Sequence, residues 1–131
     1  MNKIVNVPHR FRGPSTSGNG GYVCGLVAQS FEEPCEVTLK SPPPLDVDMN
    51  LVRTEEGASL LHGDVQIADA RPAQLDLDVP DAPNWGDAEA AVTRFVSPEL
   101  HILPECFVCG PHRHEGDGLR LFTGAVEGRD M

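Results

Sequence analysis

The stretch Arg10–Phe31, RFRGPSTSGNGGYVCGLVAQSF, contains the features that decide the fold. A strand-like start, RFR, runs into a loop of small residues, GPSTSGNGG, and the loop leads into a run with helical spacing. Ser17 or Asn19 can cap this helix, and Pro34 ends it. The apolar residues of the run share one helical face, which predicts an amphipathic helix: Tyr22, Val23, Leu26, Val27 and Phe31.

Gly25 lies in the middle of the predicted helix. A glycine there costs about 1 kcal/mol relative to alanine. It therefore predicts that the helix packs closely against another backbone, and the rest of the chain is expected to form the sheet that holds this helix.

The remaining apolar patterns predict strands and one further helix. Residues 1–9 form a short lead-in. Alternation predicts strands at 35–40, 47–54, 58–70 and 73–80, with a tight turn at 55–57. A short amphipathic helix is predicted over 87–96, and a late strand over 119–122. A single sheet on one long helix leaves a face or an edge bare, so a second copy is expected.

The composition limits the function classes. The chain has 131 residues and a formal net charge of −10, which argues against unspecific binding to nucleic acid or to anionic membranes. It contains no apolar run of about 18 residues. The N-terminus, MNKIVNVPHRFR, lacks the apolar core of a signal peptide. We therefore expect a cytoplasmic protein with four reduced cysteines.

Three motifs carry a resemblance to a known family: FRGPSTSGNGGYVCGLVA, VTLKSPPPLD and CFVCGPHRHEGDGLRLF. Together they resemble a family of bacterial hotdog-fold proteins of the thioesterase superfamily. The resemblance implies an α+β, hotdog-like domain in residues 1–80, with a curved antiparallel sheet wrapped around one central helix. Residues 81–131 would be a helical linker and an irregular, turn-rich tail. Family members resemble two such units in tandem, so this chain would be a first unit plus linker, pairing as a homodimer or higher oligomer.

The resemblance implies hydrolysis or binding of an acyl-CoA thioester, with no cofactor required. The N–H groups of Gly20 and Gly21 at the helix start would polarise the thioester carbonyl, since a helix N-terminus stabilises negative charge. Asn19 would orient that carbonyl or a water molecule, and Tyr22 would contact the substrate. The alternative is that the glycines simply let the chain turn into a buried helix.

Arg10 and Arg12 flank the loop in an acidic chain. Their guanidinium groups could bind the phosphates of coenzyme A in a bidentate manner. They could equally be surface or dimer-rim charges paired with the many carboxylates.

The tail offers four potential zinc ligands, Cys106, Cys109, His112 and His114. The two cysteines could instead be a redox pair, or ordinary thiols in a tight, partly buried turn.

His62 and Asp64 are two residues apart on a predicted strand and would point to the same face. Such a pair could be catalytic, although surface alternation explains it as easily.

Two other function classes stay open. The first is a non-catalytic binding or dimerisation module, favoured because the loop before the helix carries no carboxylate. The second is an interaction protein stabilised by zinc in the tail.

Overall fold

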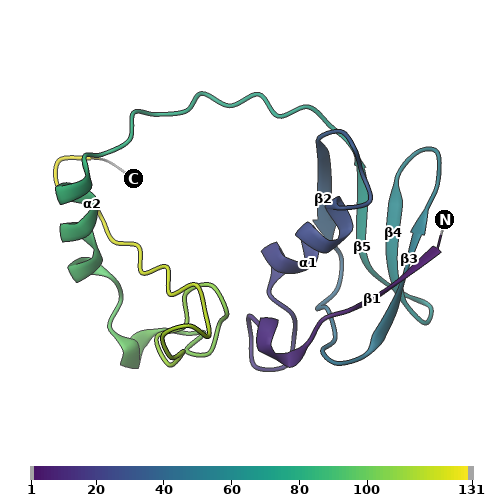
Figure 1. Ribbon diagram of the computed structural model, residues 1–131, viewed down its shortest axis with the longest axis horizontal. Coiled ribbons are helices and arrows are strands. Elements are labelled where there is room, and N and C mark those ends of the chain that lie inside the picture. Colours follow the sequence, from purple (N-terminus) through teal and green to yellow (C-terminus); the bar gives the residue numbers. More distant parts are fainter. Residues whose placement is uncertain (1, 130–131) are drawn as a thin grey trace. The chain divides into compact units, whose positions relative to one another are not determined.

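The computed structural model describes residues 2–129 (Figure 1). The chain divides into two compact units, Met1–Asp76, called unit 1, and Leu77–Met131, called unit 2. The division lies close to the boundary predicted after residue 80.

Unit 1 is an α+β unit with one five-stranded sheet, in which every neighbouring pair of strands is antiparallel. This confirms the predicted fold class at that level. The strand order across the sheet is β1-β3-β4-β5-β2, so β1 and β2 form the two edges. The elements are β1 Asn2–Asn6, α1 Gly20–Ala28, β2 Cys35–Leu39, β3 Asp48–Arg53, β4 Ala58–His62 and β5 Val65–Pro72.

The core of unit 1 forms between α1 and one face of the sheet. Val23 and Val27, four residues apart on α1, are fully buried. Met49 and Leu51 alternate inward along β3, and Leu60 does so on β4. Each buried side chain of this size stabilises the fold by about 1.5–3 kcal/mol, which is why the apolar spacing selects this packing.

The first strand lies in the lead-in, so the prediction of a strand at Arg10–Arg12 is wrong. Val5 and Val7 alternate inward and are buried. Pro8, with a φ of −57°, then ends the strand because proline has no N–H for the ladder. The following residues, His9–Phe11, form a 3₁₀ turn.

The predicted long strand over 58–70 is a hairpin of two strands, β4 and β5. His62 pairs with Val65, and Gly63 in the turn has a φ of +57°, a conformation that glycine adopts without strain. Asp64 therefore lies in a turn. The prediction that His62 and Asp64 share one face of a strand is wrong.

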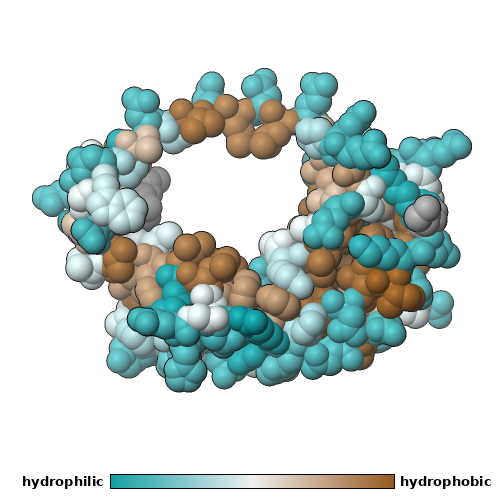
Figure 2. Space-filling model, viewed as in Figure 1, coloured by the Kyte–Doolittle hydropathy of each residue, from teal (hydrophilic) through white to brown (hydrophobic). Residues whose placement is uncertain are grey.

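The alternating segment 73–80 is not a strand in this structure. At its start, the N–H of Ala73 donates to the carbonyl of Pro34, the residue before β2, at 3.0 Å. Leu75, Leu77 and Val79 are 79%, 65% and 84% exposed. Figure 2 shows hydrophobic and hydrophilic side chains exposed along this segment between β5 and α2. Alternation predicts a strand only where a partner edge is present.

A β-bulge interrupts the pairing of β4 with β5. Leu60 pairs with Ala68 and Leu61 pairs with Gln66, so Ile67 is the extra residue. Ile67 and Ala68 are consequently both buried although they are neighbours in sequence.

Helix α1 ends at Ala28, earlier than Pro34. The N–H groups of Ser30 and Phe31 donate to the carbonyls of Val27 and Ala28, which turns the chain away. Phe31 then lies under the guanidinium of Arg53, 3.9 Å from its ring centroid.

Gly25 does not pack against another backbone within this chain, contrary to the prediction. It is exposed, and a Cβ added there would have no atom within 4 Å. The close backbone approach occurs instead at Gly57, where a Cβ would lie 2.2 Å from the carbonyl oxygen of Ala70.

Unit 2 has little regular structure. Helix α2, Trp85–Ala91, begins earlier than predicted because the side chain of Asn84 accepts a hydrogen bond from the N–H of Asp87. The predicted strand over 119–122 is absent from the described part of the chain. That segment is nevertheless anchored through hydrogen bonds from the N–H groups of Leu119 and Leu121.

Among residues 2–129, no helix is long and apolar enough to cross a membrane.

Candidate functional site

The loop before α1 is held by hydrogen bonds between backbone groups. Gly13 N–H donates to the carbonyl of Ser17 at 3.0 Å. Gly18 N–H donates to Pro43 at 2.8 Å, and Asn19 N–H donates to Phe11 at 2.8 Å. These bonds fix the position from which the helix starts.

Asn19 is the N-cap of α1. Its side-chain oxygen accepts a hydrogen bond from the N–H of Tyr22 at 3.0 Å, and its carbonyl accepts one from Val23 at 3.0 Å. The first two helical N–H groups, those of Gly20 and Gly21, have no partner within residues 2–129. Gly21 is exposed and Gly20 is half-buried, so both can meet a ligand at the positive end of the helix dipole.

The side chain of Asn19 has a structural role. Its Oδ1 accepts the hydrogen bond from Tyr22 N–H, so the residue predicted to orient a carbonyl or a water is also the cap of α1. The sequence prediction placed Asn19, Gly20, Gly21 and Tyr22 in one site, and the structure brings these four residues together in the first turn of α1.

Phe11 links the arginine side of the loop to the helix. Its ring stacks on Tyr22 with 4.1 Å between centroids and 9° between planes. The guanidinium of Arg10 lies 5.8 Å from the Phe11 centroid. Sequence reasoning missed this role of Phe11, although an aromatic residue between two arginines was a visible signal.

Arg12 is directed to its own turn. Its NH1 lies 3.1 Å from the ring Nδ1 of His9 and donates to the His9 carbonyl at 3.1 Å. Arg10 is exposed and Arg12 is half-buried.

Asp46 is a carboxylate near the loop that the sequence reasoning did not consider. It accepts a hydrogen bond from the N–H of His9 at 2.9 Å, and its own N–H donates to Val7. The first turn of α1 contains no acidic residue.

Helix α1 packs against the edge strand β2 and against β5. At the start of the helix, a Cβ on Gly20 would lie 3.1 Å from Cδ1 of Leu39. At the other end, Ala28, Cys35 and Leu75 help to line a cavity of about 400 Å³. Leu39 therefore lies near the free N–H groups at the start of α1, and the cavity, which Glu33 and Glu36 also line, lies at the other end of the helix.

The four candidate zinc ligands of the tail are not drawn together in one cluster among the described residues. Among the described residues, no three His, Cys, Asp or Glu side chains are grouped so that they could hold a metal ion. Cys106 is buried and Cys109 is half-buried. Burial and a hydrogen bond with Cys106 raise the pKa of the Cys109 thiol. Burial also raises the pKa of Cys24 on α1.

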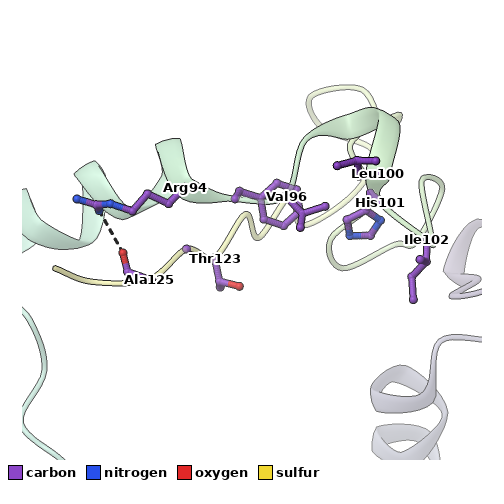
Figure 3. A pocket seen from close by; sticks show the side chains of 9 residues that line it. Arg94, Val96, Leu100, His101, Ile102, Thr123 and Ala125 are labelled. Carbon is purple, nitrogen blue, oxygen red and sulfur yellow. Dashed lines mark hydrogen bonds between the residues drawn. The ribbon is translucent and has the colours of Figure 1, made fainter. Parts of the chain in front are cut away.

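A separate cavity of about 570 Å³ lies in unit 2 (Figure 3). Arg94 at one end of it donates a hydrogen bond to the carbonyl of Ala125 at 3.1 Å, and the rings of Phe95 and His101 lie 5.4 Å apart, tilted by 31°. None of the site residues predicted from the sequence line this cavity. Its lining residues are Arg94, Phe95, Val96, Leu100, His101, Ile102, Thr123, Gly124 and Ala125.

No family model matches the chain, and neither the curated proteins nor the solved structures include a significant match. The function proposed below therefore rests on the site residues and on the resemblance carried by the sequence motifs.

Proposed function

We propose that unit 1 is a hotdog-like domain that binds an acyl-CoA thioester at the N-terminus of α1 and hydrolyses it. The observation that carries the proposal is the pair of N–H groups on Gly20 and Gly21, which have no partner among the described residues. Two such donors at a helix start can stabilise the oxyanion that forms when water attacks the thioester carbonyl.

The acyl chain would lie between α1 and β2. Leu39 beside Gly20 offers the first apolar contact, and the cavity at Ala28 and Cys35 would receive the end of the chain. The nine-residue helix is about 13 Å long, which favours an acyl chain of medium length.

The coenzyme A moiety would extend from the loop. Arg10 is exposed beside the stacked pair of Phe11 and Tyr22. This arrangement suits a ligand that carries both phosphates and an adenine ring, because arginine binds phosphate and aromatic rings stack on bases.

We also propose that the protein acts as a homodimer. Strands β1 and β2 are hydrogen-bonded to a neighbour on one side only, and the outer face of α1 exposes Gly21 and Gly25. A second copy would cover such an edge or face and enclose the acyl chain.

A second candidate function is a non-catalytic module that binds an acyl-CoA without hydrolysing it. The absence of an acidic residue from the first turn of α1 favours this candidate, since no general base adjoins the free N–H groups there.

The first experiment measures free thiol released from short, medium, long and aromatic acyl-CoAs by the purified protein. Turnover with a preference for medium chains supports the hydrolase. Saturable binding without turnover supports the non-catalytic module. Neither binding nor turnover with any member of the panel refutes both proposals.

A pair of variants at Gly20 tests the N–H group directly. Asn19 has a ψ of 128°, which is compatible with a following proline, and proline is well tolerated as the first residue of a helix. Gly20→Pro therefore removes one N–H while α1 is kept, and Gly20→Ala adds a Cβ while the N–H is kept.

We expect Gly20→Pro to lower turnover by about 10²–10³-fold, and Gly20→Ala to lower it much less. If both substitutions have the same effect, the Gly20 N–H is not an oxyanion donor and the steric contact with Leu39 explains the loss.

A further inference from the structure

The turn Cys106–Gly110 in unit 2 is held rigidly by its own backbone. The carbonyl of Cys106 accepts a hydrogen bond from Gly110 N–H at 2.8 Å. Phe107 and Val108 accept hydrogen bonds from Leu119 and Leu121, at 2.8 and 2.9 Å. Every carbonyl from residue 106 to 108 is therefore engaged, which restricts the relative motion of the two cysteines.

Two further features fix this turn. A Cβ at Gly110 would lie 2.5 Å from the nitrogen of Cys106, so only glycine fits there. Arg113, which is 5% exposed, lies beneath the turn and donates to the carbonyl of Glu105 at 2.8 Å and to Asp117 at 3.1 Å.

The two cysteines lie three residues apart in this one turn. Cys106 is 3% exposed, whereas Cys109 is half-buried and can be reached from solvent. Within the described residues no third His, Cys, Asp or Glu joins them in a metal-binding group. The fold thus holds two neighbouring cysteines in one rigid turn, one buried and one within reach of solvent.

We propose that Cys106 and Cys109 are a redox-reactive dithiol, which closes to an intramolecular disulfide by exchange with a small-molecule disulfide of the glutathione class. The chemistry of the proposal does not depend on the thioester site of unit 1.

The exchange has two steps. The Cys109 thiolate attacks one sulfur of the small disulfide, so that a mixed disulfide forms and the first small thiolate leaves and takes up a proton. The Cys106 thiolate then attacks the Cys109 sulfur and releases the second small thiol. The protein loses two hydrogens and the small disulfide is reduced to two thiols.

The structure assigns the two cysteines different roles. Cys109 is the attacking thiol because a small disulfide can reach it from solvent, and Cys106 is the resolving thiol because it is buried three residues away in the same turn. Cys24 and Cys35 lie in unit 1, and the structure contains no disulfide between any of these cysteines.

The test incubates the reduced full chain with a graded series of oxidised-to-reduced glutathione ratios. The samples are quenched with acid, the free thiols are blocked with a maleimide, and the peptides are analysed by mass spectrometry. We expect the peptide with Cys106 and Cys109 to lose two hydrogens at a ratio at least about tenfold lower than that which modifies Cys24 or Cys35.

Two variants separate the roles. Cys106→Ser should retain a stable glutathione adduct on Cys109, and Cys109→Ser should leave Cys106 as a free thiol. Circular dichroism shows whether Cys106→Ser folds. If it does not, the measurement on the wild-type protein alone decides the proposal.

Three results would overturn the proposal. The wild-type protein could accumulate the Cys109 adduct without closing, or the pair could oxidise no more readily than Cys24 and Cys35. The two thiols could also resist both reagents until a chelator is added, which would assign them to a metal.

Discussion

At the scale of single residues, Asn19 has two roles. It stabilises α1 as its N-cap, and it is proposed to contact the substrate. Its Oδ1 caps α1, so Asn19→Ala would remove the cap and would change stability as well as chemistry. Loss of such a cap costs about 1 kcal/mol. Substitutions that retain a capping oxygen are therefore the informative ones.

We predict that Asn19→Asp and Asn19→Ser both keep the free energy of unfolding within about 0.5 kcal/mol of the wild type, because Asp and Ser are good N-caps. Asn19→Asp should nevertheless lower thioester turnover, or acyl-CoA affinity, by at least about tenfold. Its carboxylate would place a negative charge beside the proposed oxyanion. Urea unfolding and thiol release measure the two effects, and equal activity of the two variants would contradict the role of this helix start.

Gly57 and Gly25 form a matched pair for a test of stability. Gly57→Ala should lower the free energy of unfolding by about 2–3 kcal/mol, because its Cβ would lie 2.2 Å from the Ala70 carbonyl oxygen. Gly25→Ala should raise it by about 0.5–1 kcal/mol, because the added Cβ meets no atom within 4 Å. Urea unfolding at low protein concentration checks both values.

A loss of stability in Gly25→Ala that grows with protein concentration would show that Gly25 packs against a second copy. The close packing expected from the sequence would then occur between chains rather than within one.

Ala28 offers a test of the proposed acyl path. Ala28→Met should fill part of the cavity of about 400 Å³ at the end of α1, and should shift the preferred acyl chain to a shorter one. Gln29→Met is the matched control, since Gln29 is exposed and does not line the cavity. The acyl-CoA panel provides the measurement, and an unchanged preference in Ala28→Met would place the chain elsewhere.

At the scale of the elements, the sequence predicted α1 well because its signals are local. Asn19, as the cap, and the apolar spacing of Val23 and Val27 both refer to contacts within one or two helical turns. The helix end was misplaced because a turn at Ser30 and Phe31 closes the helix before Pro34.

The strands were harder to predict because a strand depends on its partner. Unit 1 was predicted to contain five strands and contains five, but three of the predicted strands differ. The lead-in at 2–6 pairs with β3, whereas the equally alternating segment 73–80 has no partner. Gly63 was overlooked as a hairpin turn because the alternation of Val65 and Ile67 seemed to continue through it.

The candidate site was predictable only where its contacts are local in the sequence. The grouping of Asn19, Gly20, Gly21 and Tyr22 follows from their sequence positions at one helix start. The contacts of Leu39 with Gly20, and of Asp46 with His9, join residues far apart in the chain. No local pattern could have revealed them.

At the scale of the whole molecule, the connection between the two units is exposed at every residue from 74 to 82. Leu75 and Leu77 are 79% and 65% exposed. We predict that a protease with chymotrypsin-like specificity cuts first within 74–83, and that mass spectrometry detects one fragment for each unit. Exposed backbone without regular hydrogen bonds is the preferred site of cleavage. First cuts in the turn at 55–57 would contradict this prediction.

The bulge at Ile67 also determines where the length of this chain can vary. Ile67 is the extra residue between the pairs Leu61–Gln66 and Leu60–Ala68, so a deletion of Ile67 would leave Ala68 opposite Leu60 and would preserve the inward face. A deletion of Asp69, beyond the bulge, would instead turn every following side chain of β5 to the opposite face. Homologous chains that differ by one residue in this strand should therefore have gained or lost it at the bulge.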